Sequence, residues 1–283
     1  MTAVAARAAQ SDNPPPEPQS KVVARVGRHR RPELSPVGQW LALTGRNIRG
    51  MWTSGQLLIA VLAPAIFTIG FYLPLRLVMR FQGIDYAQFV MAIIVLQAMA
   101  FTAISAAGKA ALEAVNGMDA RFKTMPIFAG VPLASRMSAS FVHCTISLIA
   151  ALAYGHIIGF RFQGGPANTV AFIGLSLTFA MTLSLAGDLI GTLSKSPVIT
   201  SQALTIPQLI LGMFSAGFIP VEQFPSWSQA FVRNQPVSQF AIAMRAIAEG
   251  NATMDLIAPA IWWSIGLFVV IAPLTVWANV RRK

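Results

Sequence analysis

The sequence predicts an all-α polytopic membrane protein with six transmembrane helices, an N-terminal interfacial helix and an external re-entrant helical hairpin before the last span. Of its 283 residues, 55% are hydrophobic and only 11% are charged, whereas about a quarter of the residues in soluble domains are charged. The 21 Lys and Arg residues outnumber the 10 Asp and Glu residues, giving a net charge of +11. Long apolar runs exclude an ordinary soluble enzyme and argue against nucleic acid as the partner of this positive charge.

The first 34 residues are predicted to form a disordered cytoplasmic tail. Residues 13–18, NPPPEP, are too rich in proline for a helix or a strand, and a basic run follows over residues 21–31. The segment has no apolar stretch of the kind that marks a secretory signal peptide. A contact of its arginines with anionic lipid headgroups is a second expectation.

Residues 35–54 are predicted to form a helix that lies in the membrane surface. On a helical wheel, Trp40 and Trp52 fall on an apolar half, whereas Arg46 and Arg49 lie opposite. The stretch is too interrupted to cross a bilayer, and its two-sided pattern is typical of an interfacial helix.

Six apolar stretches are long enough to cross a bilayer, which takes about 20 residues. They cover residues 57–77, 86–107, 138–160, 169–189, 198–218 and 257–276. Three of them contain proline (Pro64, Pro207 and Pro259), which membrane helices tolerate better than soluble helices do. An even number of spans places both termini on one side.

Lysine and arginine are distributed unevenly between the two sides of this topology. All but five of the 21 lie on the side of the termini; the five others are Arg76, Arg80, Arg161, Arg233 and Arg245. Because positively charged residues are retained in the cytoplasm, the pattern predicts a plasma-membrane protein with cytoplasmic N- and C-termini.

The sequence carries no signature of a nucleotide or metal site. A Walker A loop needs a glycine directly before its lysine, and none precedes Lys195 in residues 191–196, GTLSKS. With one cysteine, Cys144, and three histidines without HExxH spacing, no metal is expected. We therefore expect this chain to bind no cofactor, and any ATP and Mg²⁺ to be bound by a partner ATPase.

A long cytoplasmic loop is predicted over residues 108–135. In residues 113–126, charged residues alternate with apolar ones, and a proline ends the segment. Two interpretations are open: a solvated loop whose apolar residues touch headgroups, or a short docking helix with Phe122 and Met125 inserted into a partner's groove. The candidate coupling residues are Glu113, Asp119, Arg121, Phe122, Lys123, Met125 and Pro126.

Residues 219–255 are predicted to form a long external segment that is semi-apolar and broken by prolines. Irregular backbone at membrane depth persists only where protein buries it or where it lines a wet cavity. Five aromatic residues are expected at the interfacial level, either as a belt without a transport role or as an outer lid; they are Phe218, Phe224, Trp227, Phe231 and Phe240. The candidate gate residues are Phe218, Pro220, Phe224, Trp227, Arg233, Asn234, Gln235 and Pro236.

Asp188 is the one acidic residue inside a predicted span. An intramembrane carboxylate indicates a proton path or a substrate contact. Asp188 lies near the cytoplasmic end of the fourth span, however, so structural contact with water or Lys195 is the favoured interpretation. Polar packing is expected for His143, and space filling for Cys144.

Several segments resemble ABC-2 type permeases. Residues 121–127, RFKTMPI, look like the segment after the second helix of these proteins, which joins the membrane domain to the ATPase. Residues 217–227, GFIPVEQFPSW, and 231–239, FVRNQPVSQ, are similar to the actinobacterial daunorubicin/doxorubicin-resistance-type permeases, and most similar to their B-type subunit. FYLP at residues 71–74, GFRF at 159–162 and DLIG at 188–191 fit the same pattern.

The resemblance covers residues 55–283 and implies a six-helix half-transporter. It implies a coupling helix within residues 113–126 and a pair of short re-entrant helices in the external segment. Such permeases pair with two copies of an ATP-binding subunit and with a second permease, which for a B-type subunit favours a C-type partner over a second copy. They export amphipathic lipids or hydrophobic drugs, so the chain is expected to be a transport subunit and not an enzyme.

Two other classes of function are alternatives at this point. A proton-driven carrier or channel would need several intramembrane polar residues or inverted repeats. A membrane-embedded lipid-modifying enzyme would need a clustered acid, base or metal site. Neither feature is evident, which favours the exporter.

Overall fold

The computed structural model describes residues 35–83 and 85–281, so the predicted tail over residues 1–34 lies outside the described part. The described residues form helices and no strands, which confirms the all-α prediction. In chain order the elements are α1 (Pro36–Thr53), α2 (Gln56–Phe81), α3 (Tyr86–Val115), α4 (Met118–Thr124), α5 (Val131–Ile158), α6 (Gly165–Leu193), α7 (Pro197–Met213), the short 3₁₀ helix η2 (Val221–Gln223), α8 (Ser226–Asn234), α9 (Pro236–Glu249) and α10 (Met254–Arg281).

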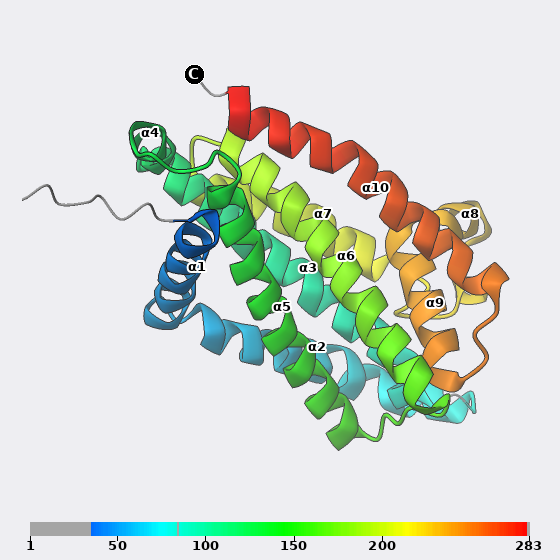
Figure 1. Ribbon diagram of the computed structural model, residues 1–283. Coiled ribbons are helices and arrows are strands. Elements are labelled where there is room, and N and C mark those ends of the chain that lie inside the picture. Colours follow the sequence, from blue (N-terminus) through cyan, green and yellow to red (C-terminus); the bar gives the residue numbers. More distant parts are fainter. Residues whose placement is uncertain (1–34, 84, 282–283) are drawn as a thin grey trace, which may run out of the picture. The chain divides into compact units, whose positions relative to one another are not determined.

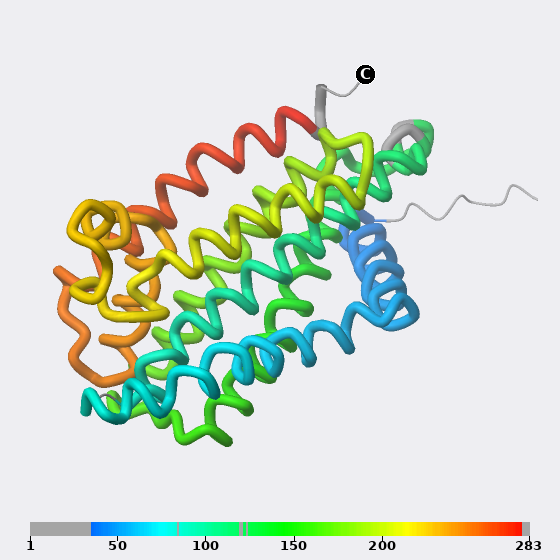
Figure 2. Tube along the Cα trace, turned by 180° about the vertical axis from the view of Figure 1, so that it is seen from behind, coloured from blue at the N-terminus to red at the C-terminus, as the bar shows by residue number. Residues whose placement is uncertain are grey.

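Five of the described helices are long and apolar enough to cross a membrane: α2, α3, α5, α6 and α10. Each overlaps a predicted span. Figure 1 shows α3, α5, α6 and α10 side by side with the shorter α7, and Figure 2 shows the same arrangement from behind. The chain is therefore a polytopic helical membrane protein.

The fifth predicted span, residues 198–218, is helical only as far as Met213. With 17 residues, α7 is at the lower limit for crossing a bilayer. The segment nevertheless runs antiparallel along α3. Gln208 Nε2 donates to Gln97 Oε1 at 3.1 Å, and the Tyr86 hydroxyl at the start of α3 donates to the Phe218 carbonyl at 3.3 Å. A sixth crossing by this segment stays a prediction.

The prediction of a loop over residues 108–135 is wrong for most of its length. α3 continues to Val115, α5 begins at Val131, and α4 occupies part of the connection. Lys109 and Glu113 end the apolar run of α3 without ending the helix, because both side chains are largely enclosed by protein and have partners there.

The central helix is α3, against which α2, α5, α6, α7 and α9 pack. Its approach to α6 is close because two glycines of α6, Gly187 and Gly191, face the backbone of α3. A Cβ atom on Gly187 would lie 2.6 Å from the Ala103 carbonyl oxygen, and one on Gly191 would overlap the Ala107 carbonyl oxygen. Small residues four positions apart allow membrane helices to pack in this way.

The external segment contains two short helices, α8 and α9, that meet at Gln235. α9 packs against α3, α6 and α10, and its Met244 side chain is buried. The expectation that Phe240 belongs to an interfacial belt is wrong. Its ring is buried, with its centroid 4.6 Å from that of Phe179 on α6, because α9 turns back against the bundle. Re-entry of this helix pair into the membrane stays a prediction.

The glycine contacts between α3 and α6 predict a site-specific loss of stability. We expect Gly191→Ala and Gly187→Ala each to lower the free energy of unfolding by about 1–3 kcal/mol, because the added methyl overpacks the helix contact. Gly174→Ala on the same helix is the matched control, since nothing lies within 4 Å of its added Cβ. Unfolding in a denaturing-detergent titration measures the difference; equal stability of the three variants would contradict the close approach.

Candidate functional site

A buried ion pair joins Asp188 of α6 to Arg136 of α5. Arg136 Nε donates to Asp188 Oδ1 at 2.7 Å, and Nη2 donates to Oδ2 at 3.1 Å. The exposed fractions of the two residues are 1% and 7%. Asp188 is thus paired, but the prediction of Lys195 as its partner is wrong. Lys195 is exposed beyond the end of α6, whereas α5 begins early enough to bring Arg136 to the carboxylate.

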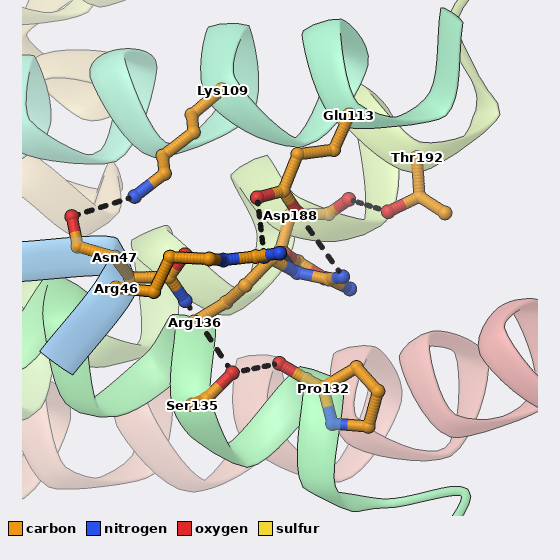
Figure 3. A network of polar contacts seen from close by, with 9 residues as sticks. All are labelled: Arg46, Asn47, Lys109, Glu113, Pro132, Ser135, Arg136, Asp188 and Thr192. Atoms are coloured by element: carbon orange, nitrogen blue, oxygen red, sulfur yellow. Dashed lines mark hydrogen bonds and ion pairs between the residues drawn. The ribbon is translucent and has the colours of Figure 1, made fainter. Parts of the chain in front are cut away.

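Glu113 of α3 extends this pair into a network of charges, drawn in Figure 3. Arg136 Nη1 lies 3.6 Å from Glu113 Oε2, and Arg46 Nη2 of α1 lies 3.8 Å from Glu113 Oε1. Glu113 is therefore part of the bundle, and its expected place in a docking loop is wrong. Through two carboxylates, the network connects α1, α3, α5 and α6.

α1 is attached to the bundle by its polar side chains. Asn47 Nδ2 donates to Ser135 Oγ at 3.4 Å, and Lys109 Nζ donates to the Asn47 carbonyl oxygen at 3.4 Å. Gln39 reaches the connection after α4, where its Nε2 donates to the Pro126 carbonyl at 3.3 Å and its Oε1 accepts from the Phe128 amide at 3.3 Å. α1 thus holds both the start of α5 and the segment that leads from α4 to α5.

The opposite side of α1 is exposed and amphipathic. The helix itself is confirmed, but Trp40 faces the protein, where its Nε1 donates to Ser138 Oγ of α5 at 3.0 Å. The exposed side carries an apolar stripe, Val37, Leu41 and Trp52, beside the exposed Arg49. Such a surface suits a helix at the boundary between headgroups and acyl chains.

α4 lies within the predicted coupling segment. The Arg46 guanidinium of α1 stands over the Phe122 ring, 5.3 Å from its centroid, which is within the range of a cation–π contact. Met125 follows the helix and is 51% exposed, and Arg121 is exposed as well. The side chains of Asp119 and Lys123 lie outside the described part. Of the two expected anchors, Met125 is open to a partner and Phe122 contacts α1.

At the other end of α3, some of the predicted gate residues join neighbouring helices through hydrogen bonds and ring contacts. Buried Gln235 donates through Nε2 to the Leu211 carbonyl at 3.1 Å and to Ser238 Oγ at 3.2 Å, which links the end of α7 to α9. The Phe218 ring meets that of Phe71 on α2 edge-on, with centroids 5.0 Å apart. Phe224 is buried in a small apolar cluster beside η2. Trp227, Arg233 and Asn234 are exposed, while Pro220 and Pro236 stand at the starts of η2 and α9.

Arg245 of α9, within the predicted external segment, also belongs to this end. Its guanidinium lies over the Phe89 ring of α3, 3.5 Å from the centroid. Its Nη2 donates to the carbonyl oxygens of Phe89 at 3.3 Å and Ala216 at 3.0 Å. Burial lowers the pKa of Arg245 to about 10, so the group stays protonated at neutral pH. These partners are an aromatic face and backbone carbonyls, which no sequence pattern marks.

Comparison with known proteins gives consistent matches. The model of the family described as "ABC-2 family transporter protein" matches residues 73–281. The doxorubicin resistance ABC transporter permease protein DrrB of Mycobacterium tuberculosis is 34% identical over 233 residues, which cover 77% of this chain and 81% of that protein. The daunorubicin resistance ABC transporter permease protein DrrB1 of Streptomyces coeruleorubidus is 26% identical over 78% of each chain. The probable doxorubicin resistance ABC transporter permease protein DrrC of M. tuberculosis is 27% identical over 56% of this chain and 58% of its own.

The buried ion pair predicts a strong coupling between two substitutions. Arg136→Met alone should lower the free energy of unfolding by about 3–5 kcal/mol, because it leaves the buried Asp188 carboxylate without its ion-pair partner. Asp188→Leu alone should cost less, because Arg136 keeps its contact with Glu113, and the double variant should recover part of the loss of Arg136→Met. Lys195→Met is the control and should leave stability unchanged. Detergent unfolding of the four proteins measures the coupling, and strictly additive losses would contradict it.

Proposed function

The chain belongs to the ABC-2 family of transporter permeases, and we propose that it is the membrane subunit of an exporter whose energy comes from separate ATP-binding subunits. The observation that carries this proposal is the attachment of α4 to the α1–α3–α5–α6 network at one end of the spanning helices. Buried, mutually neutralised charges are costly to separate, so helices joined by them move together.

In this proposal, a movement that starts in the ATP-binding subunits reaches the spanning helices through a series of described contacts. Closure of the ATPase dimer displaces α4, and the contacts of Phe122 with Arg46 and of Gln39 with the α4–α5 connection pass the displacement to α1 and α5. Glu113 and Asp188 then carry α3 and α6 along as a rigid body. At the far end of α3, the Tyr86 hydroxyl is hydrogen-bonded to the Phe218 carbonyl, and the Phe89 carbonyl accepts from Arg245 of α9. Through these bonds the external segment follows the movement.

The partners and cargo follow from the likeness to the drug-resistance permeases. Similarity to both DrrB and DrrC supports a heterodimer with a C-type permease, served by two ATP-binding subunits that bind ATP and Mg²⁺. The names of the relatives point to hydrophobic drugs such as doxorubicin, and amphipathic lipids share the same chemistry. The excess of basic residues near the termini supports their cytoplasmic location in the plasma membrane.

A proton-driven mechanism is less well supported. Both carboxylate oxygens of Asp188 accept hydrogen bonds from Arg136, so this carboxylate serves a structural ion pair in the described bundle. Among the described residues, no cluster of three or more His, Cys, Asp or Glu side chains is arranged to hold a metal ion.

The proposal predicts that the α4 end binds the ATPase. We expect Met125→Asp to reduce co-purification of the ATP-binding subunit at least about tenfold, because it places a charge in an apolar contact. Met254→Asp is the matched control, since Met254 is also exposed but starts α10 at the other end of the bundle. ATP-dependent doxorubicin movement in proteoliposomes containing the ATPase and the second permease is the functional measurement. Movement that persists without ATP and the ATPase would overturn the proposal.

A second prediction separates coupling from binding. Arg46→Gln removes both the Glu113 ion pair and the Phe122 ring contact. We expect the ATPase to stay bound and to hydrolyse ATP while export falls several-fold. Arg49→Gln, on the exposed face of the same helix, should leave export unchanged. Equal export by the two variants would exclude α1 from the route.

A further inference from the structure

A pocket of about 370 Å³ lies between the junction of α8 with α9 and the early turns of α10. Figure 1 shows α9 beside this part of α10, against which it packs. The volume is within the range of small-molecule sites, about 300–1,000 Å³. None of the five lining side chains is charged; they are Asn234, Gln239, Pro259, Trp262 and Trp263. The pocket therefore combines aromatic surface with neutral polar groups.

The two amide side chains of the pocket each have one unused oxygen. Asn234 Nδ2 donates to the Ala230 carbonyl at 2.9 Å, and Gln239 Nε2 donates to the Arg233 carbonyl at 2.7 Å. Because a backbone carbonyl only accepts, these bonds fix which end of each amide is the nitrogen. Asn234 Oδ1 and Gln239 Oε1 have no partner among the described residues. Asn234 is exposed, and Gln239 Oε1 is not one of the buried unpaired atoms, so a ligand can reach both oxygens.

The two tryptophans supply apolar ring surface and indole N–H groups. Trp262 is 70% exposed and Trp263 is 39% exposed. Within the part of the chain that the structure describes, neither indole has a ring contact or a hydrogen-bond partner for its Nε1 atom. An indole buries a large apolar face and donates one hydrogen bond through its N–H group. Both kinds of contact are therefore free for a ligand.

This lining matches a hydroxylated ring. The unused amide oxygens need hydrogen-bond donors, which hydroxyl groups supply and ketones or ethers do not. A charged ligand would find no counter-ion among the lining side chains. A sugar ring meets both conditions, because its hydroxyl groups donate and accept around the edge of the ring. Its C–H groups also form an apolar face that stacks on an indole.

An apolar surface continues from the pocket along α10. Val269 and Val270 follow Trp262 and Trp263 by seven residues, which places them on the same side of the helix two turns further along. They are 61% and 60% exposed. They lie near the middle of α10, whereas the pocket lies nearer to its start. A molecule with a sugar and an apolar chain would therefore place the chain toward the middle of a spanning helix and the sugar nearer to its end.

We propose that the pocket binds the sugar ring of an amphipathic glycoside, whose apolar chain lies along the exposed side of α10. The ring stacks on an indole, and its hydroxyl groups donate to Asn234 Oδ1 and Gln239 Oε1. The pocket is formed by this chain alone, so binding requires neither the ATPase nor the second permease. In the proposed exporter it is a subsite for glycosylated cargo; that role rests on the proposed function, whereas the binding does not.

The test compares three small molecules that divide the ligand into its parts. Hexyl glucoside has the ring and the chain, methyl glucoside has the ring alone, and hexanol has the chain alone. Ligand-observed NMR measures their binding to the full chain, alone in phosphatidylcholine nanodiscs, with empty nanodiscs as the reference for partition into lipid. Hexyl glucoside should bind at least about tenfold more tightly than either, because each part contributes at least as much as one good hydrogen bond or two buried methylenes.

Two pairs of variants assign the binding to this pocket. Gln239→Met and Trp262→Leu should each weaken binding of hexyl glucoside at least about tenfold, because they remove an acceptor and a ring surface. Gln229→Met is the matched control for the first, since Gln229 Nε2 also donates to a backbone carbonyl, that of Phe224 at 2.9 Å, outside the pocket. Trp227→Leu is the control for the second, because Trp227 is 79% exposed on α8 and lines no part of the pocket.

Three results would overturn the proposal. Equal affinity for methyl glucoside would assign the pocket to a soluble sugar, and equal affinity for hexanol would remove the sugar from recognition. Pocket variants that bind hexyl glucoside as well as their controls would place the binding elsewhere. Trp262 is largely exposed, so Trp262→Leu remains a test if Gln239→Met does not fold.

The outcome also separates this inference from the proposed function. Binding of hexyl glucoside without ATP-driven export would refute the exporter and keep the pocket. Export without binding of hexyl glucoside would refute the pocket and keep the exporter. Where both are observed, equal export of a glycosylated drug by Trp262→Leu and Trp227→Leu would refute the cargo role alone.

Discussion

The contact on which the rest of the structure depends is the neutralisation of buried charge at one end of the bundle. Asp188 cannot remain ionised in an apolar interior without a partner, and the bidentate pair with Arg136 supplies one. This pairing requires α5 to begin at Val131 and α3 to continue far enough to bring Glu113 alongside. The position of α1, and through it that of α4, then follows from the Arg46 and Asn47 contacts.

α3 joins the two ends of the molecule. Glu113 lies near one end of this helix, while Tyr86 and Phe89 at the other end contact the region after α7 and Arg245 of α9. Its middle part contacts α6 through glycine and alanine, and the same small residues open a cavity beside Gln97. Some of the residues that allow these two helices to pack closely therefore also line this cavity between α3, α6 and α7.

The sequence was sufficient for the helical class and for a helix at residues 36–53, because these depend on the length and periodicity of apolar runs, and its motifs were sufficient for the family. It was insufficient wherever a polar residue finds its partner inside the protein. Glu113 was placed in a loop because charge usually marks solvent, and nothing in the sequence singled out Arg136 or Arg245 as buried groups. Phe240 was misplaced because an aromatic residue suits a core as well as an interface. Gln97 interrupts an apolar run and was detectable as a polar group at membrane depth, but its pairing with Gln208 of α7 is visible only in three dimensions.

The contacts of α1 also constrain how the protein is made. Its hydrogen bonds to Pro126 and Ser138 join residues that are 87 and 98 positions apart in the chain. At a synthesis rate of about 5–20 residues per second, the ribosome needs roughly 5–20 s to produce these partners after α1 itself. During that interval α2 and α3 must be inserted, and α1 lacks its final contacts with protein. The exposed apolar stripe of α1 and the neighbouring Arg49 form a surface that suits contact with a bilayer, which would shield the helix during that interval.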